Sequence, residues 1–168
     1  MNSKRHRNSV LTAGVVLGVG MGGFVDGILF HQIIQTHNML SAIHFPDTLV
    51  NAEINMFWDG LFHVFTWITT AIGLAILWRG VHREDSLPTT RSFLGALSLG
   101  WGFFNVVEGV IDHHILHLHH VVERLGISAW DYAFLGSGVM LVLVGFNLMR
   151  GKEGAEISAE VRPVGFRS

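Results

Sequence analysis

The sequence predicts an all-α integral membrane protein, in which four transmembrane helices form a bundle of two tandem helical-hairpin repeats. Three observations support this fold class. Of the 168 residues, 49% are hydrophobic and only 14% are charged, and the mean hydropathy is +0.43, values typical of a membrane protein. Four apolar stretches reach the length of about 20 residues that a helix needs to cross a bilayer. The first and third stretches also share a pattern of glycines and polar residues.

The predicted spans cover about residues 10–34, 54–78, 93–116 and 130–149. Together they make a membrane domain over residues 10–150, with the first repeat at 10–79 and the second at 92–150. Residues 1–9 form a basic leader. The stretch that follows it is too long for a signal peptide and lacks a small-residue cleavage site. Residues 151–168 are predicted to be a disordered tail.

Basic residues predict the orientation of the spans. They lie before the first span, between the second and third, and after the fourth, whereas the other two loops contain only Arg124. The positive-inside rule therefore predicts a multi-pass protein with both termini and the middle loop in the cytoplasm. Nearly all the ionisable residues inside the spans then lie in the outer half of the membrane.

An internal repeat relates the two hairpins. A shift of 82 positions places Gly18–Asn38 over Gly100–His120, and a shift of 72 places Trp58-Asp59 over Trp130-Asp131. Both copies run in the same direction, so the sequence predicts a pseudo-two-fold axis along the membrane normal. The equivalent pairs that carry polar chemistry are Asp26 and Glu108, His31 and His113, and His37 and His119. The copies differ at three pairs: Phe30 and Asp112, His63 and Leu135, and Gln35 and His117.

Ionisable side chains inside a membrane are costly unless they are paired or bound to a metal, and they usually mark a functional site. The segment "EGVIDHHILHLHHV" carries two acids and five histidines within about four helical turns. The chain has no cysteine, which excludes thiolate and Fe–S sites. Imidazole and carboxylate ligands suit Zn, Fe, Mn or Cu(II). Haem with two axial histidines and a metal-free hydrogen-bonded network are the alternatives.

The candidate metal ligands are the acids and histidines that share this depth: Asp26, His31, His37, Asp59, His63, Glu108, Asp112, His113, His117 and His119. Three further residues are candidates for holding those ligands in place: Asn105, His120 and Asp131. The preferred ligand set is His63, His113, either His117 or His119, and either Glu108 or Asp112. Ordinary α-helical geometry places Asp26 and His31 about 140° apart. The two are therefore not expected to bind one atom unless the helix is distorted near Gly27.

The motifs "GVGMGGFVDGILFHQIIQTHNML", "DGLFHVFTW", "GWGFFNVVEGVIDHHILHLHHV" and "DYAFLGSG" resemble the bacterial membrane family catalogued as domain of unknown function 2243. The resemblance covers about residues 10–150 and implies a small four-span protein of the bacterial inner membrane. It also implies genomic proximity to cytochrome oxidase assembly proteins. The motif positions in this chain are Asp26, His31, His37, Asp59, His63, Asn105, Glu108, His113, His114, His119 and His120.

The first functional hypothesis is metal binding in metal handling, with a respiratory enzyme or its assembly factor as partner. The second is a membrane metalloenzyme, an oxidase or hydrolase, acting on a lipid-soluble substrate. The third is a proton or ion conductor in which Asp26 and Glu108 form a relay. The net charge of −2 gives no reason to expect a nucleic-acid partner. Homo-oligomerisation stays open.

Overall fold

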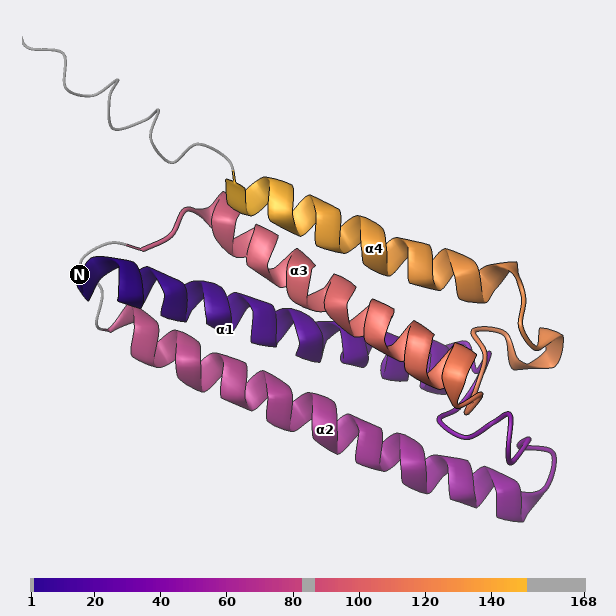
Figure 1. Cartoon of the computed structure of the whole chain (residues 1–168). Helices are drawn as coiled ribbons and strands as arrows, with labels where there is room; N and C mark the ends of the chain where they lie inside the picture. Colours follow the sequence, from indigo (N-terminus) through magenta and orange to yellow (C-terminus); the bar gives the residue numbers. More distant parts are fainter. Residues whose placement is uncertain (1, 83–86, 151–168) are drawn as a thin grey trace, which may run out of the picture.

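The computed structural model describes residues 2–82 and 87–150, and these form four long helices joined at alternating ends (Figure 1). Two of the helices are extended by a π-helical segment. The elements are α1 (Asn2–Val25) with η1 (Asp26–Ile33), α2 (Leu49–Val81), α3 (Thr90–Glu108) with η2 (Gly109–Ile115), the short η3 (Glu123–Leu125), and α4 (Ala129–Arg150). Each long helix, with its extension, is long and apolar enough to cross a membrane. The predicted all-α, four-span fold is thus confirmed.

Two helix boundaries differ from those expected. The α2 helix begins at Leu49 and not near residue 54, because the Thr48 side chain accepts a hydrogen bond from Asn51 N and caps the helix there. The α1 helix begins at Asn2, so the leader continues the first span as helix. The predicted disordered tail lies outside the described residues.

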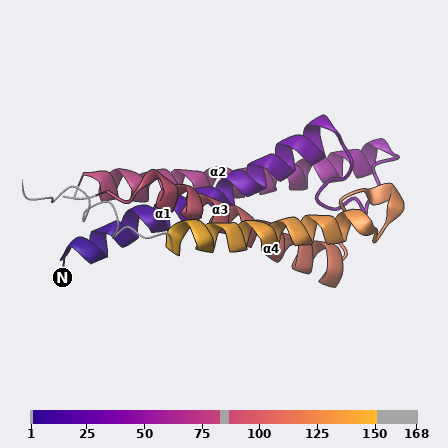
Figure 2. The ribbon, with the colours of Figure 1, turned by 90° about the horizontal axis from the view of Figure 1, so that it is seen from above.

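The α1 and α3 helices form the centre of the bundle, with α2 packed on α1 and α4 packed on α3 (Figures 1 and 2). In the most apolar 18-residue stretches of the first and third spans, 50% and 44% of the stretch is buried inside the protein. In those of α2 and α4, only 11% is buried. Within the described part of the chain, the α2 and α3 backbones do not approach each other. The apolar outer faces of α2 and α4 are therefore available for lipid.

Glycines allow the two central helices to cross at very short range. A Cβ atom on Gly18 would collide with the carbonyl oxygen of Leu97, and one on Gly100 would collide with that of Val15. These two contacts are equivalent under the 82-residue shift, which also relates Leu97 to Val15. Close approach of backbones through small residues is the usual way in which membrane helices associate.

The repeat seen in the sequence is also a repeat of backbone conformation. Both central helices change from α to π geometry within one residue of the same place in the repeat. Val25 and Glu108 are the last α-helical positions, and Glu108 is the equivalent of Asp26. Beyond each π-helix, one residue adopts a positive φ, 56° at Gln35 and 49° at His117, and these positions are again 82 apart. The two loops that follow lie together at the end of the bundle opposite the N-terminus (Figure 1). The chain is thus two hairpins of one design.

Candidate metal centre

The π-helical segments bring acids and histidines five residues apart onto one face. In a π-helix the backbone bonds join residues i and i+5, so side chains at that spacing lie one above the other. His31 Nε2 accordingly lies 3.1 Å from Asp26 Oδ2. The helix distortion that this pairing requires is present from Asp26 onward, so Asp26 and His31 do share a site. The equivalent residues of the second repeat, Glu108 and His113, form a group with His119. The possible ligand atoms of these three residues lie within 4.8 Å of one another.

Four histidines, two from each repeat, meet between the central helices. The ring centroids of His37 and His119 are 4.7 Å apart, with the ring planes 1° from parallel. The ring centroids of His31 and His37 are 4.8 Å apart, as are those of His113 and His119. All four side chains are buried, with at most 2% of each residue exposed. We call these four residues, together with Asp26 and Glu108, the central cluster.

A carboxylate from the second helix of each repeat supports one histidine of the central cluster. Asp59 Oδ1 on α2 lies 3.0 Å from His31 Nδ1, and Asp131 Oδ1 on α4 lies 3.2 Å from His113 Nδ1. A carboxylate at Nδ1 favours the tautomer that leaves Nε2 free to bind a metal, and this arrangement is common around metal-bound histidines. Asp59 and Asp131 are buried, at 1% and 0% exposure.

The other two histidines are held by backbone carbonyls from the opposite repeat. His37 Nδ1 donates to Val121 O at 3.0 Å, and His119 Nδ1 donates to Met39 O at 3.2 Å. The backbone N–H of Met39 in turn donates to Asp59, and that of Val121 donates to Asp131. Met39 and Val121 are repeat equivalents, so the support is symmetric and crosses between the repeats. Because these two residues act through the backbone, no side-chain motif could have revealed their role.

The central cluster has more polar atoms than it can satisfy internally. Ten buried side-chain nitrogen and oxygen atoms in the described residues lack an aligned hydrogen bond, and all belong to Asp26, Glu108 or histidines at this end. They include the Nε2 atoms of all four cluster histidines and one oxygen of each acid. The Nδ1 atoms of His31 and His113 are also among them, although a carboxylate lies close to each. Buried polar atoms without partners are costly, and a metal ion bound among the cluster histidines could satisfy several of their Nε2 atoms.

His119 lies beyond the third span, and its surroundings favour the neutral ring. Burial, followed by the nearby His37 and His113 rings, holds the pKa of His119 well below its usual range. Because its Nδ1 carries the proton that is donated to Met39 O, its Nε2 lone pair is free. This is the protonation state that a metal ligand needs.

Several predicted site residues lie outside the central cluster. His63 Nδ1 lies 2.7 Å from Asp59 O in its own helix, and its ring is next to Gly27. His117 is exposed, and Asp112 is half-buried. Two members of the preferred ligand set do meet, because His119, in the loop after η2, has its Nε2 atom 3.5 Å from Glu108 Oε1.

The three predicted supporting residues lie close to the cluster. His120 Nδ1 lies 3.6 Å from Asp131 Oδ1, and Asn105 donates to Ser137 Oγ at 3.2 Å. Asp131 supports His113 as described above. Four residues predicted as ligands therefore lie outside the central cluster: Asp59, His63, Asp112 and His117. The residues in the centre are three pairs that are equivalent under the 82-residue shift: Asp26 and Glu108, His31 and His113, and His37 and His119.

The fold and this site define a class of protein: a four-span membrane protein with a buried cluster of histidines and carboxylates on a pseudo-two-fold axis. The chain belongs to a family described as predicted membrane protein, domain of unknown function 2243, whose model matches residues 13–152. The match covers most of the first span, all of the other three and the whole central cluster. No curated protein and no solved structure shows significant similarity to the chain.

Proposed function

We propose that this protein holds one transition metal ion between its two repeats, at the end of the bundle formed by the loops after η1 and η2. The observation that carries the proposal is that His31, His37 and His119 offer ligand atoms within 4.8 Å of one another, and so do Glu108, His113 and His119. In each of these four histidines the Nδ1 lies near a carboxylate or a backbone carbonyl, whereas the buried Nε2 has no aligned hydrogen bond. Asp26 and Glu108 add carboxylate oxygens on either side.

The sharing of His119 favours a single ion. His119 belongs both to a group with His31 and His37 and to a group with Glu108 and His113. An imidazole nitrogen has one lone pair and binds one ion, so His119 can serve only one of the two groups at a time, which favours one ion per chain. Four nitrogen and two oxygen donors suit Zn, Fe, Mn or Cu(II). A haem fits less well, because stacked rings 4.7 Å apart leave no slot for a macrocycle between them.

The burial of the ligands supports a resident metal more than a transported one. The four histidines are at most 2% exposed, and Asp26 and Glu108 are 3% and 5% exposed. Delivery of the ion to a respiratory enzyme or its assembly factor would require an exit path through this packing. The positive-inside rule supports an orientation in which the central cluster faces away from the cytoplasm of a bacterial inner membrane.

The test is elemental analysis and an absorption spectrum of the full chain, purified in detergent without a polyhistidine tag. We expect about one Zn, Fe, Mn or Cu ion per chain and no Soret band. A Soret band would indicate haem instead. Protein that binds no metal even after metal is supplied would contradict the proposal and leave a hydrogen-bonded network, to be tested as a proton path in liposomes.

Matched histidine variants locate the ion. His113→Ala removes a buried cluster ligand and should abolish most of the bound metal. His82→Ala removes an exposed histidine at the opposite end of α2 and should leave the metal content unchanged. If the two variants retain equal amounts of metal, the ion is not in the central cluster.

A further inference from the structure

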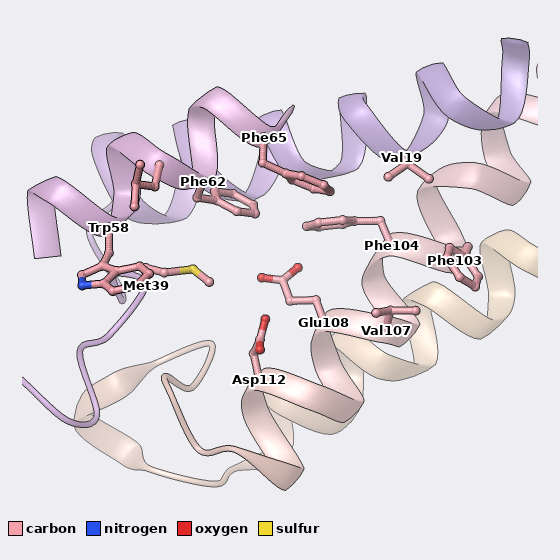
Figure 3. Close-up of a pocket in the computed structure, with 11 residues that line it drawn as sticks. Val19, Met39, Trp58, Phe62, Phe65, Phe103, Phe104, Val107, Glu108 and Asp112 are labelled. Carbon is pink, nitrogen blue, oxygen red and sulfur yellow. The ribbon is translucent and has the colours of Figure 1, made fainter. Parts of the chain in front are cut away.

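A cavity of about 420 Å³ lies between α2 and α3, directly beside the central cluster (Figure 3). Its walls are almost entirely apolar. Aromatic side chains come from both helices, namely Trp58, Phe62, Phe65, Phe103 and Phe104. Because the α2 and α3 backbones do not approach each other, this side of the bundle faces the lipid.

Two acids stand at the inner end of the cavity. Glu108 and Asp112 both point into it from α3 and η2 (Figure 3). Glu108 is only 5% exposed, and its Oε2 atom has no hydrogen-bond partner in the described structure. A buried acceptor without a partner, at the end of an apolar cavity, fits a ligand that brings a hydrogen-bond donor with it.

The other repeat has a smaller equivalent cavity. It lies between α4 and α1 and measures about 160 Å³. Under the 82-residue shift, Phe30 replaces Asp112 and Trp101 replaces Val19, so the second acid is missing, and Gly22 stands where the larger cavity has Phe104. The larger cavity is thus specific to one repeat and is not a packing defect shared by both.

We propose that this cavity binds a membrane-soluble phenol of the hydroquinone type, with its ring among the aromatic side chains and a hydroxyl donating to Glu108 Oε2. The aromatic walls fit a planar ring. Asp112 accepts from the same hydroxyl or from a second donor on the ligand. A neutral phenol also enters from lipid at a lower cost than an ammonium ion would.

This inference rests on the proposed function in one respect: it names a small molecule that would bind beside the metal centre, in contact with Glu108 of the central cluster. Its physical basis is separate, because the cavity and the free oxygen of Glu108 are present whatever the cluster binds. Metal content and ligand binding are therefore measured on the same samples. Metal without ligand binding would overturn this inference alone, and ligand binding without metal would overturn the metal proposal alone.

The probe is decylubiquinol, and its dimethyl ether serves as the ligand without donors. Equilibrium binding is measured with the purified full chain in lipid nanodiscs. Val107→Phe places a ring inside the cavity, whereas Val144→Phe makes the same change on the lipid-facing side of α4 at similar exposure, 42% against 37%. Leu61→Trp, on the α2 wall of the cavity, is the second filling variant if Val107→Phe fails to fold.

We expect the hydroquinone to bind saturably and the ether to bind at least about tenfold more weakly. A filling variant should lower the hydroquinone affinity by about tenfold or more. Val144→Phe should bind like the original chain, and all folded variants should keep their metal. Equal binding of the ether, or undiminished binding to a folded filling variant, would overturn the inference.

Discussion

The two carboxylates at the Nδ1 positions provide a sharp test of how the centre is built. Asp59→Asn and Asp131→Asn remove a negative charge next to His31 and His113, at distances of 3.0 and 3.2 Å. The remaining amide oxygen can still accept from the ring, so the orientation is partly kept. The ring itself becomes a weaker ligand, because the negative charge that raised its basicity is gone.

The size of the effect follows from these contacts. Loss of a group that supports a metal ligand usually lowers metal affinity about 10- to 100-fold, which corresponds to roughly 1.4–2.7 kcal/mol. The asparagine variants belong at the lower end of this range, since they keep one acceptor. In Asp59→Asn, the new amide NH₂ would also face Asn38 Nδ2, and the hydrogen bond of 2.8 Å that Asn38 donates to Asp59 would be lost. That loss should lower the stability of the fold by about 1–3 kcal/mol.

The assay is competition between the metal-loaded protein and a soluble chelator of known affinity, with thermal unfolding measured in parallel. Asp47→Asn is the matched control, because Asp47 is an exposed acid at the same end of the bundle. Both asparagine variants should lose affinity to a similar degree, as the pseudo-symmetry requires. Unchanged affinity in both would refute a supporting role for these carboxylates. A loss in only one would show that a single repeat builds the centre.

Two further predictions concern the helix crossing and the loop after η2. Gly100→Ala should lower stability in detergent by about 1–3 kcal/mol, because its Cβ would collide with Val15 O. Gly136→Ala is the control and should have little effect, because there is open space around its Cβ. Equal melting temperatures of the two variants would contradict the tight crossing. His117→Gly should leave metal content unchanged and slightly raise stability, because His117 is exposed and has a φ of 49°; loss of metal would return His117 to the ligand set.

Hydropathy and the repeat determined most of the fold in advance. Length and composition are enough to define four spans, because a lipid environment admits few alternatives to continuous helices. The repeat already identified Asp26 and Glu108 as equivalent residues, and likewise His31 and His113. The structure places all four in the central cluster. The glycines shared by the first and third spans include Gly18 and Gly100, where the two central helices cross at short range.

The grouping of ligands was beyond the sequence because it depended on a local change of helix type. An α-helical wheel separates Asp26 from His31, and the π-helical turn brings their side chains together. The repeated spacing of an acid, a glycine and a histidine five residues after the acid was the one signal of this change. The preference for His63, and for His117 as the alternative to His119, rested on their depth in the membrane. The structure instead places the His63 ring beside Gly27 and leaves His117 exposed.

What the sequence determined by itself was the number of spans, their two-fold relation and the kinds of side chain at one end of the bundle. Only the tertiary structure decided which atoms meet. The backbone of Met39 and Val121 fixes His119 and His37 across the repeats, and such bonds leave no trace in side-chain identity. The cavity beside Glu108 likewise depends on where α2 lies relative to α3. Both features are set by long-range packing, whereas composition and periodicity report only the local environment of each residue.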